Sequence, residues 1–414
     1  MSIWHIYGGN RLTGSTRVQG AKNAVLPIMA ASVLSGGETV LHNVPDLRDV
    51  TTTLRILQHL GCTAVRDGDT VRIDSRGMHC DFIPHALMRE LRSSVIFLGA
   101  ILARFGTARL SMPGGCELGP RPVNLHLDAL RALGAEVTER GGDIICRAHA
   151  LQGRRILLPF PSVGATENVM LAACAAAGET VICNAAREPE IGDLIDFLRA
   201  CGADIRGEGS LLRIRGGVPL TGACHTVLPD RMEAATYLAA AAATRGDVTL
   251  TNVRPEHLTA VLAVLEHAGC TLTQQNGMLR LRCSRLRAAG PIRTAPYDGF
   301  PTDAQAPLMA AMAVAEGVTV FEENLFEDRF RHVPALRALG AHIHAARRYA
   351  VVTGVRELHG ASMTATDLRG GAAMVIGALC ARGESELAGT AHLKRGYAEL
   401  VPTLRACGAD ITER

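Results

Sequence analysis

The residue of this sequence most suited to covalent or proton-transfer chemistry is a cysteine in a glycine-rich stretch. Cys116 follows two glycines in SMPGGCELGPRPVNLH, residues 111–126, and Arg121 lies between two prolines five residues further on. Glycine lets a loop change shape, whereas proline fixes the backbone on either side of the arginine. A thiol near cations has a lowered pKa, so Cys116 is a candidate nucleophile or proton donor. The stretch predicts a loop that closes over a bound substrate and excludes water.

Basic residues elsewhere indicate which groups that substrate carries. Of the 43 basic residues only Lys22 and Lys394 are lysine, so the compact charge of Lys22, within GAKN, is a distinctive choice. Arginine grips phosphate or carboxylate with two parallel hydrogen bonds, which predicts a small ligand bearing both groups. Asp303 is expected as an unpaired, ionised carboxylate that takes a proton from a substrate hydroxyl. The expected cations are Lys22, Arg92, Arg121, Arg369 and Arg395, with Arg329 in a loop within reach.

Several expected helices begin with capping signals, and a helix start is also an anion site because its N–H groups point outward. Any one of these signals could simply begin a helix. Their neighbours, including Asn23 beside Lys22 and Ser162-Val163-Gly164, favour a shared anion-attracting cleft. The signals are Thr166-Glu167, the DxxE of Asp230 to Glu233, the TxxQ of Thr302 to Gln305, and Thr366 before Asp367 and Arg369.

The elements that position these residues form an internal repeat. One short motif, as in LGCTAV and CGADIT, recurs with its glycine at residues 61, 134, 202, 269, 340 and 408, at intervals of about 70 residues. Each repeat also holds an Ala-rich helix that runs into a short strand. The predicted order is helix, strand, amphipathic helix ending at the glycine, strand, turn, strand. Cysteines beside these glycines, such as Cys62 and Cys201, are expected as small packing residues.

The repeat predicts an inside-out α/β fold with buried helices and solvent-facing sheets. TYLAAAAAT, residues 236–244, is apolar nearly all round, which is typical of a helix buried on every side. LRLR, residues 279–282, alternates, which is typical of a strand with one face in water. Six repeats divide into two domains of three: residues 1–20 with 230–414, and residues 21–229. The first twenty residues are expected to supply the strands that complete the last repeat.

Composition excludes several classes of protein. A net charge of +3 is too small to draw the whole molecule to nucleic acid, and the run Arg280, Arg282, Arg285, Arg287 and Arg293 is interpreted as a solvated strand face. The N-terminus does not resemble a signal peptide and no apolar run approaches the ~20 residues of a membrane span, so a cytoplasmic protein with no membrane partner is expected. The sequence has no CxxC, HExxH, Walker A or GxGxxG motif, and predicts neither a metal nor a cofactor.

Nine motifs in order resemble the UDP-N-acetylglucosamine 1-carboxyvinyltransferases, a family of enolpyruvyl transferases. They run from about residue 4 to the C-terminus: QGAKNAVLP, MPGGCELGPRPVNLH, PSVGAT, NAAREPEI, LPDRMEA, FPTDAQ, FEDRFRHVPAL, ATDLR and HLKRGYAEL. The family has an inside-out α/β fold of two domains with three repeats each. The resemblance implies addition of the sugar 3'-hydroxyl to C2 of phosphoenolpyruvate, followed by loss of phosphate, at the start of peptidoglycan precursor synthesis.

The resemblance also implies roles for individual residues. Asp303 would be the base, and Cys116 the loop thiol that acts as general acid and binds fosfomycin. Asp367 would support the tetrahedral intermediate. Lys22, Asn23, Arg121, Arg369 and Arg395 would bind phosphoenolpyruvate. The sugar nucleotide would contact Asn23, Arg92, Arg121, Pro122, Val123, Asn124, Leu125, Ser162, Val163, Gly164, Asp303 and Phe326.

Three positions depart from the family pattern, and two alternatives remain. Asn124 stands where many members have aspartate, Lys394 adds a cation beside Arg395, and Phe160 cannot contribute a charge. The related 3-phosphoshikimate 1-carboxyvinyltransferases lack the PGGC loop and begin with a different lysine motif. A catalytically silent sugar-nucleotide-binding paralogue is the second alternative, which the presence of Cys116 and Asp303 disfavours.

Overall fold

The computed structural model describes residues 2–111 and 123–414, which group into two compact units. Unit 1 contains the residues up to Gln19 together with Pro229–Arg414, and unit 2 contains the described residues from Gly20 to Leu228. Along its described residues, the chain passes from one unit to the other after Gln19 and after Leu228. Among the described residues, no helix is both long and apolar enough to cross a lipid bilayer.

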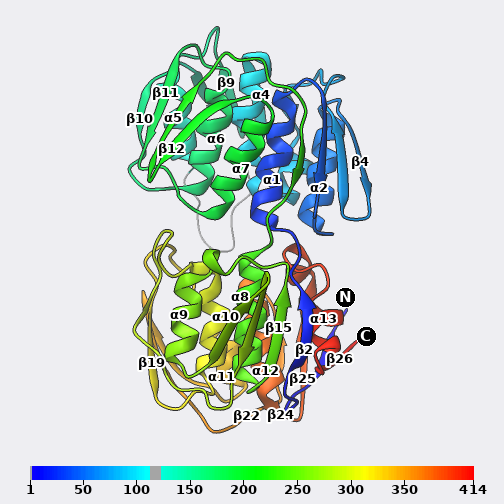
Figure 1. The fold of residues 1–414 in the computed structure, drawn as a ribbon, viewed down its shortest axis with the longest axis vertical. Helices are drawn as coiled ribbons and strands as arrows, with labels where there is room; N and C mark the ends of the chain where they lie inside the picture. Colours follow the sequence, from blue (N-terminus) through cyan, green and yellow to red (C-terminus); the bar gives the residue numbers. More distant parts are fainter. Residues whose placement is uncertain (1, 112–122) are drawn as a thin grey trace. The chain divides into compact units, whose positions relative to one another are not determined.

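In each unit the helices of low polarity are buried, as the sequence predicts. In α8 (Arg231–Ala243) every residue from Met232 to Ala243 is buried. In unit 1, α8 packs against α10 (Thr302–Met312) and α12 (Leu368–Cys380), and these two pack against each other (Figure 1). Alanine side chains allow these helices to approach closely. The helices of unit 2 are α1 (Lys22–Ala31), α2 (Arg48–His59), α3 (His85–Glu90), α4 (Phe97–Phe105), α5 (Asn124–Ala132), α6 (Val163–Ala173) and α7 (Pro189–Ala200). Those of unit 1 are α8 (Arg231–Ala243), α9 (Thr259–His267), α10 (Thr302–Met312), α11 (Val333–Ala338), α12 (Leu368–Cys380) and α13 (Leu400–Ala406).

In the part of the chain that the structure describes, each unit has three four-stranded sheets with one face in water. In unit 2 their orders are β14(Cys224–Thr226)-β3(Glu38–His42)-β5(Thr70–Asp74)-β4(Thr63–Asp67), β6(Phe82–Ile83)-β7(Thr107–Ser111)-β9(Asp143–Arg147)-β8(Glu136–Arg140), and β10(Arg155–Leu157)-β11(Glu179–Cys183)-β13(Leu211–Arg215)-β12(Asp204–Glu208). In unit 1 they are β2(Thr13–Arg17)-β15(Asp247–Thr251)-β17(Met278–Arg282)-β16(Thr271–Gln275), β18(Ile292–Arg293)-β19(Val318–Glu322)-β21(Tyr349–Thr353)-β20(His342–Ala346), and β23(Ser362–Thr364)-β25(Glu384–Ala388)-β1(Trp4–Tyr7)-β26(Asp410–Glu413). A short pair, β22(Leu358–His359) and β24(Ala381–Arg382), joins unit 1.

The repeat glycines explain why the same turn recurs. Their φ angles are +98°, +97°, +102°, +92°, +95° and +97° at Gly61, Gly134, Gly202, Gly269, Gly340 and Gly408. Side chains other than hydrogen are strained in this conformation, so glycine ends each amphipathic helix and turns the chain into the next strand. The neighbouring Cys62 and Cys201 are buried, and burial raises the pKa of Cys62 to about 11 and that of Cys201 to about 12. These thiols are packing residues, as the sequence predicts.

The N-terminal strands correct one expectation. β1 completes the last repeat by pairing with both β25 and β26, as expected. β2 instead pairs in parallel with β15 of the fourth repeat, with Thr13 opposite Asp247. The reason is that every sheet takes a parallel strand from the end of another repeat, as β14 joins β3 in unit 2. The segment before unit 2 therefore serves two repeats of unit 1.

The arginines of the run are exposed, but only Arg280, Arg282 and Arg293 lie on strands, β17 and β18, while Arg285 and Arg287 lie in the segment between them. Arg280 Nη2 is 2.7 Å from Asp247 Oδ2, and Arg293 Nε is 2.8 Å from Glu322 Oε2. Leu279 and Leu281 point to the other side of β17 and are fully buried. The alternation therefore separates core from solvent, as the sequence interpretation proposes.

Candidate functional site

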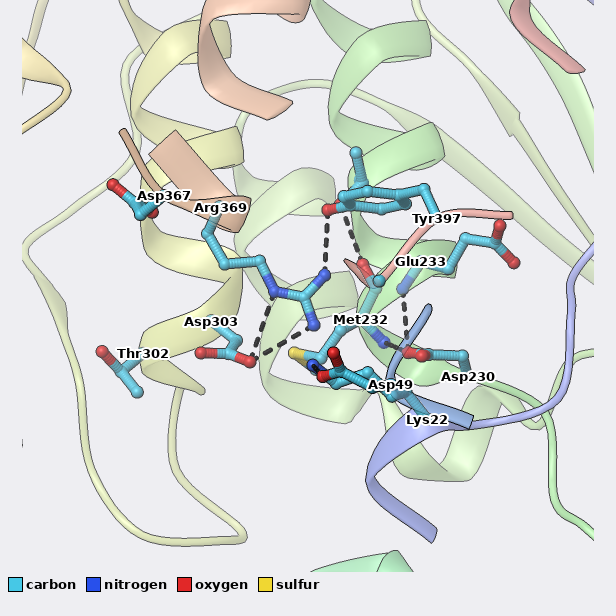
Figure 2. Close-up of polar contacts among 12 residues, drawn as sticks. Lys22, Asp49, Asp230, Met232, Glu233, Thr302, Asp303, Asp367, Arg369 and Tyr397 are labelled. Atoms are coloured by element: carbon cyan, nitrogen blue, oxygen red, sulfur yellow. Dashed lines mark hydrogen bonds and ion pairs between the residues drawn. The ribbon is translucent and has the colours of Figure 1, made fainter. Parts of the chain in front are cut away.

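The starts of the inner helices of unit 1 hold a carboxylate between two guanidinium groups. Asp303 is the second residue of α10, and Arg369 is the second residue of α12. Arg369 donates from Nε and Nη2 to Asp303 Oδ2, both at 3.3 Å, as Figure 2 shows. Arg329, from the loop after β19, donates from Nη2 to Asp303 Oδ1 at 2.6 Å. The prediction that Asp303 is unpaired is therefore wrong, because the fold brings both arginines to it.

Arg369 is itself fixed by a buried tyrosine. Its Nη1 donates to Tyr397 Oη at 2.9 Å (Figure 2). That hydroxyl also forms a hydrogen bond with Thr236 Oγ1 of α8 at 2.8 Å. Burial by itself lowers the pKa of Arg369, but Tyr397, Asp303 and Asp230 outweigh it and raise the pKa above its usual range. Arg369 therefore stays cationic in a buried place. Tyr397 and Thr236 are not among the residues predicted from the sequence.

Asp367 caps the start of α12. Its Oδ1 accepts a hydrogen bond from Gly370 N at 2.8 Å, which satisfies one free N–H of the helix. Close by, His332 is fully buried, and desolvation lowers its pKa to about 4 despite the opposing charge of Asp367. His332 is therefore neutral near pH 7. The part of Asp367 in supporting an intermediate stays a prediction.

Two other predicted residues of unit 1 lie in loops or short turns. Arg395 ends the short 3-10 helix η4 (Thr390–Arg395) and is half-buried. Phe326 is exposed, with the Arg329 guanidinium 5.6 Å from its ring centroid. The departure at Lys394 has a local explanation, since its Nζ lies 3.0 Å from Glu413 Oε1 on β26. Lys394 is thus engaged with an exposed carboxylate of the C-terminal strand.

In unit 2, Lys22 and Asn23 begin helix α1. Lys22 Nζ lies 3.1 Å from Asp49 Oδ2, and the Asp49 side chain, on α2, is almost completely buried. This ion pair orients the Lys22 ammonium group at the helix start. Asn23 is exposed beside it. Arg92 begins the short 3-10 helix η2 (Arg92–Ile96).

Unit 2 also brings two predicted sugar-nucleotide segments together. Val123 precedes α5, which begins with Asn124 and Leu125, while Ser162 caps α6, accepting from Ala165 N at 3.3 Å. His126 of α5 packs on α6, and a Cβ added to Gly164 would lie 2.9 Å from its Cε1 atom.

His126 is fixed by an asparagine of α6. Asn168 Nδ2 lies 2.9 Å from His126 Nδ1 and 2.8 Å from Val95 O, and Asn168 Oδ1 accepts from Gly99 N at 2.6 Å. Desolvation lowers the pKa of His126 to about 4, so its ring is neutral near pH 7. His126 is the last residue of the motif MPGGCELGPRPVNLH, but nothing in the sequence indicates that it packs against α6.

The capping predictions are correct in part. Asp230 accepts from Met232 N and Glu233 N at 2.8 and 3.0 Å, and so caps α8. The TxxQ prediction is wrong, because Pro301 precedes α10 without a side-chain cap and Thr302 Oγ1 donates to Glu323 Oε2 at 2.8 Å.

The Thr166-Glu167 prediction is also wrong. Helix α6 begins three residues earlier, at Val163, and Ser162 is its cap. Thr166 Oγ1 instead donates to Ser162 O at 2.8 Å. Glu167 is buried, which raises its pKa well above the usual range, and nearby Glu190 and Glu188 raise it further.

Cys116, Arg121 and Pro122 lie outside the described residues. Within residues 2–111 and 123–414, no group of three or more His, Cys, Asp or Glu side chains is placed to hold a metal ion. The described site residues therefore consist of cations, carboxylates and helix starts, a set suited to binding an anion and moving a proton.

Comparison with known proteins agrees with this chemistry. The profile of the EPSP synthase (3-phosphoshikimate 1-carboxyvinyltransferase) family matches residues 6–404. A UDP-N-acetylglucosamine 1-carboxyvinyltransferase of Gloeobacter violaceus is 47% identical over 409 residues, covering 98% of this chain and 89% of the relative. One of Caldanaerobacter subterraneus subsp. tengcongensis is 45% identical over 403 residues, covering 97% and 96%.

Solved structures share the fold. The enolpyruvyl transferase NikO from Streptomyces tendae has a TM-score of 0.91 at 26% identity and covers 100% of this chain and 98% of its own. EPSP synthase from Acinetobacter baumannii has a TM-score of 0.76 at 21% identity, covers both chains completely, and supports the fold alone. With a profile match over nearly its whole length and relatives about 45% identical, the chain belongs to the EPSP synthase family of enolpyruvyl transferases and groups there with the UDP-N-acetylglucosamine 1-carboxyvinyltransferases.

Proposed function

We propose that the chain transfers the enolpyruvyl group of phosphoenolpyruvate to the 3'-hydroxyl of UDP-N-acetylglucosamine and releases phosphate. This reaction is the first committed step of peptidoglycan precursor synthesis, and its substrates are cytoplasmic small molecules. The observation that carries the proposal is the sequence identity of about 45% to UDP-N-acetylglucosamine 1-carboxyvinyltransferases over nearly the full chain. The Asp303 site of unit 1 supplies chemistry that such a reaction needs.

The proposed reaction adds the sugar oxygen to C2 of phosphoenolpyruvate while C3 gains a proton. The tetrahedral intermediate then loses phosphate from C2 and a proton from C3, which restores the double bond. Asp303 takes the hydroxyl proton in the first step. Arg329 and Arg369 donate hydrogen bonds to both oxygens of this carboxylate, which orients it before substrate arrives. Cys116 is the proposed acid.

The anionic substrate is assigned to the cations. The proposed ligands of the phosphate and carboxylate of phosphoenolpyruvate are Lys22, Asn23, Arg121, Arg369 and Arg395. Arg369 suits this role because Tyr397 and Asp303 fix its guanidinium in a buried position, so little side-chain freedom is lost on binding. Asp367 supports the intermediate.

The second substrate is assigned to polar and small groups. The sugar nucleotide binds Arg92, Pro122, Val123, Asn124, Leu125, Ser162, Val163, Gly164 and Phe326. The start of α6 offers backbone N–H groups near Gly164, where the absence of a side chain lets the His126 ring pack closely against the helix.

A phosphate-release assay with two acceptors tests this proposal. Phosphoenolpyruvate with UDP-N-acetylglucosamine is expected to release phosphate, whereas phosphoenolpyruvate with shikimate 3-phosphate is not. Asp303→Ala is expected to abolish release, because the base is lost and two arginines lose their counter-ion. Asp196→Ala, which removes an exposed carboxylate paired with Arg199, is the matched control and should keep full activity. If phosphate is released only with shikimate 3-phosphate, the 3-phosphoshikimate 1-carboxyvinyltransferase activity is supported instead. If no phosphate is released with either acceptor, the chain is a catalytically silent paralogue.

A further inference from the structure

Gln19, the last residue of unit 1 before the chain passes into unit 2, is held at every polar group that it has. Its backbone N–H donates to Glu233 Oε2 at 2.7 Å, and its carbonyl accepts from Asp230 N at 2.9 Å. Glu233 is fixed in turn by Tyr237, whose hydroxyl donates to Oε1 at 2.9 Å. Because both backbone groups are anchored on the start of α8, the Gln19 side chain projects from a rigid base.

The side-chain amide of Gln19 grips the turn that follows Arg395. Its Nε2 donates to Gly396 O at 2.9 Å, and its Oε1 accepts from Ala398 N at 3.0 Å. The side-chain amide of Gln19 thus bonds the carbonyl of Gly396 and the N–H of Ala398, two residues further along the chain. A neighbouring β-strand would bond the same pair of backbone groups. The turn between these two contacts contains Tyr397, which bonds Arg369.

The same turn is packed tightly against α12. A Cβ added to Gly396 would lie 2.5 Å from Leu368 Cδ2, so the turn has little space to shift toward that helix. On its other side the Tyr397 hydroxyl reaches Arg369 Nη1 at 2.9 Å and Thr236 Oγ1 at 2.8 Å. Gln19, Leu368 and Tyr397 therefore hold one short segment, and that segment carries Arg395 at its start.

We propose that Gln19 is a positioning residue that sets Arg395 and, through Tyr397, Arg369 for binding the phosphate and carboxylate of phosphoenolpyruvate. This inference rests on the function proposed above. Gln19 touches no substrate in this role. Its amide replaces strand pairing in a segment of irregular backbone, so that the arginine beside it is ordered before substrate binds.

Steady-state kinetics of Gln19→Leu tests the proposal, because leucine has a similar volume and no hydrogen-bonding groups. We expect the KM for phosphoenolpyruvate to rise at least roughly tenfold, while the KM for UDP-N-acetylglucosamine changes less than twofold. Gln58→Leu, on α2 of unit 2, is the matched control, since Gln58 Nε2 also donates to a backbone carbonyl, Ala64 O of β4, at 2.9 Å. Equal changes in both KM values, or no change in either, would overturn the proposal.

Gln19→Glu provides a second readout that a purely structural role would not produce. The ionised glutamate keeps an acceptor for Ala398 N but opposes the Gly396 carbonyl, whereas the protonated form can donate to it again. The ratio of variant to wild-type kcat/KM for phosphoenolpyruvate should therefore rise as the pH is lowered from 8 to 5.5. A ratio independent of pH counts against the proposal.

Hydrogen exchange separates this inference from the proposed function. In Gln19→Leu, amides of the peptide 393–400 should exchange at least roughly tenfold faster than in wild type, with no substrate present. If the wild type releases no phosphate from either substrate pair, the proposed function fails, while the exchange measurement still tests whether Gln19 orders the turn of residues 396–398. If wild type is active and Gln19→Leu exchanges at the same rate as wild type, only the positioning role of Gln19 is overturned.

Discussion

Units 1 and 2 have the same repeat but prepare their helix starts by different physical means. In unit 1 the starts of α10 and α12 carry opposite charges, with Asp303 Oδ2 and Arg369 Nε 3.3 Å apart, and buried Tyr397 orients the cation. In unit 2 the starts of α5 and α6 are fitted by volume, with the neutral ring of His126 against Gly164. Activity is thus expected to fall when a charged group of the unit 1 site is moved, and when a larger side chain is introduced at the packed helix starts of unit 2.

The largest effect is expected in unit 1 from Arg369→Lys. The charge remains, but a lysine cannot bond Asp303 and Tyr397 at the same time with a planar fork. We expect kcat/KM for phosphoenolpyruvate to fall roughly 10²–10³-fold, the usual cost of one misplaced charge-stabilising donor. Arg293→Lys, which alters an exposed pair with Glu322, is the control in a steady-state assay. A decrease of less than fivefold in kcat/KM would show that a positive charge at residue 369 is sufficient and that the planar guanidinium is not required.

A smaller effect is expected in unit 2 from Gly164→Ala. The new methyl group would meet His126 Cε1 at 2.9 Å, and overpacking of this kind costs about 1–3 kcal/mol. The KM for UDP-N-acetylglucosamine should rise roughly tenfold, the equivalent of 1.4 kcal/mol. Gly192→Ala on α7 is the matched control, because a Cβ there meets nothing within 4 Å. Its KM should not change, and its stability should rise by about 0.5–1 kcal/mol. Equal KM values for the two variants would remove the packing argument.

The last effect concerns the dependence of stability on pH rather than substrate binding, and is expected from His126→Gln. Burial lowers the pKa of His126 from 6.5 to about 4, so between these pH values the unfolded chain binds more protons than the folded one. This histidine therefore makes the free energy of unfolding fall as the pH drops from 6.5 to 4, by up to about 1.4 kcal/mol per pH unit.

Urea unfolding followed by circular dichroism at pH 7 and pH 5 measures this difference. Glutamine keeps an acceptor for Asn168 and cannot titrate, so the variant should lose about 2 kcal/mol less than wild type on acidification. Glu233, whose pKa burial raises to about 8, has the opposite dependence, but it is present in both proteins and cancels. His359→Gln, at an exposed position, should behave as wild type. Identical acid sensitivity of wild type and His126→Gln would contradict a buried neutral ring.

The sequence predicted the features that depend on local pattern. The glycines that end the amphipathic helices, the alternation of Leu279 and Leu281 in β17, and the apolar α8 all follow from periodicity and backbone preference. It did not predict contacts between side chains distant in the chain. Asp303 was expected without partners because its pairing with Arg329 depends on the path of a loop 26 residues away. The contact of Tyr397 with Arg369 and that of His126 with Asn168 likewise depend on how separate helices pack.

The exchange of strands among repeats also sets an order for assembly during synthesis on the ribosome. Trp4 pairs with Glu413 and Thr13 with Asp247, so the first strands wait for partners made hundreds of residues later. The sheets of unit 2 are complete once β14, Cys224–Thr226, pairs with β3. Unit 2 can therefore finish folding while almost half of the chain is still to be translated. β2 then stays unpaired until β15 emerges, and β1 must avoid aggregation until β25 and β26 emerge near the C-terminus.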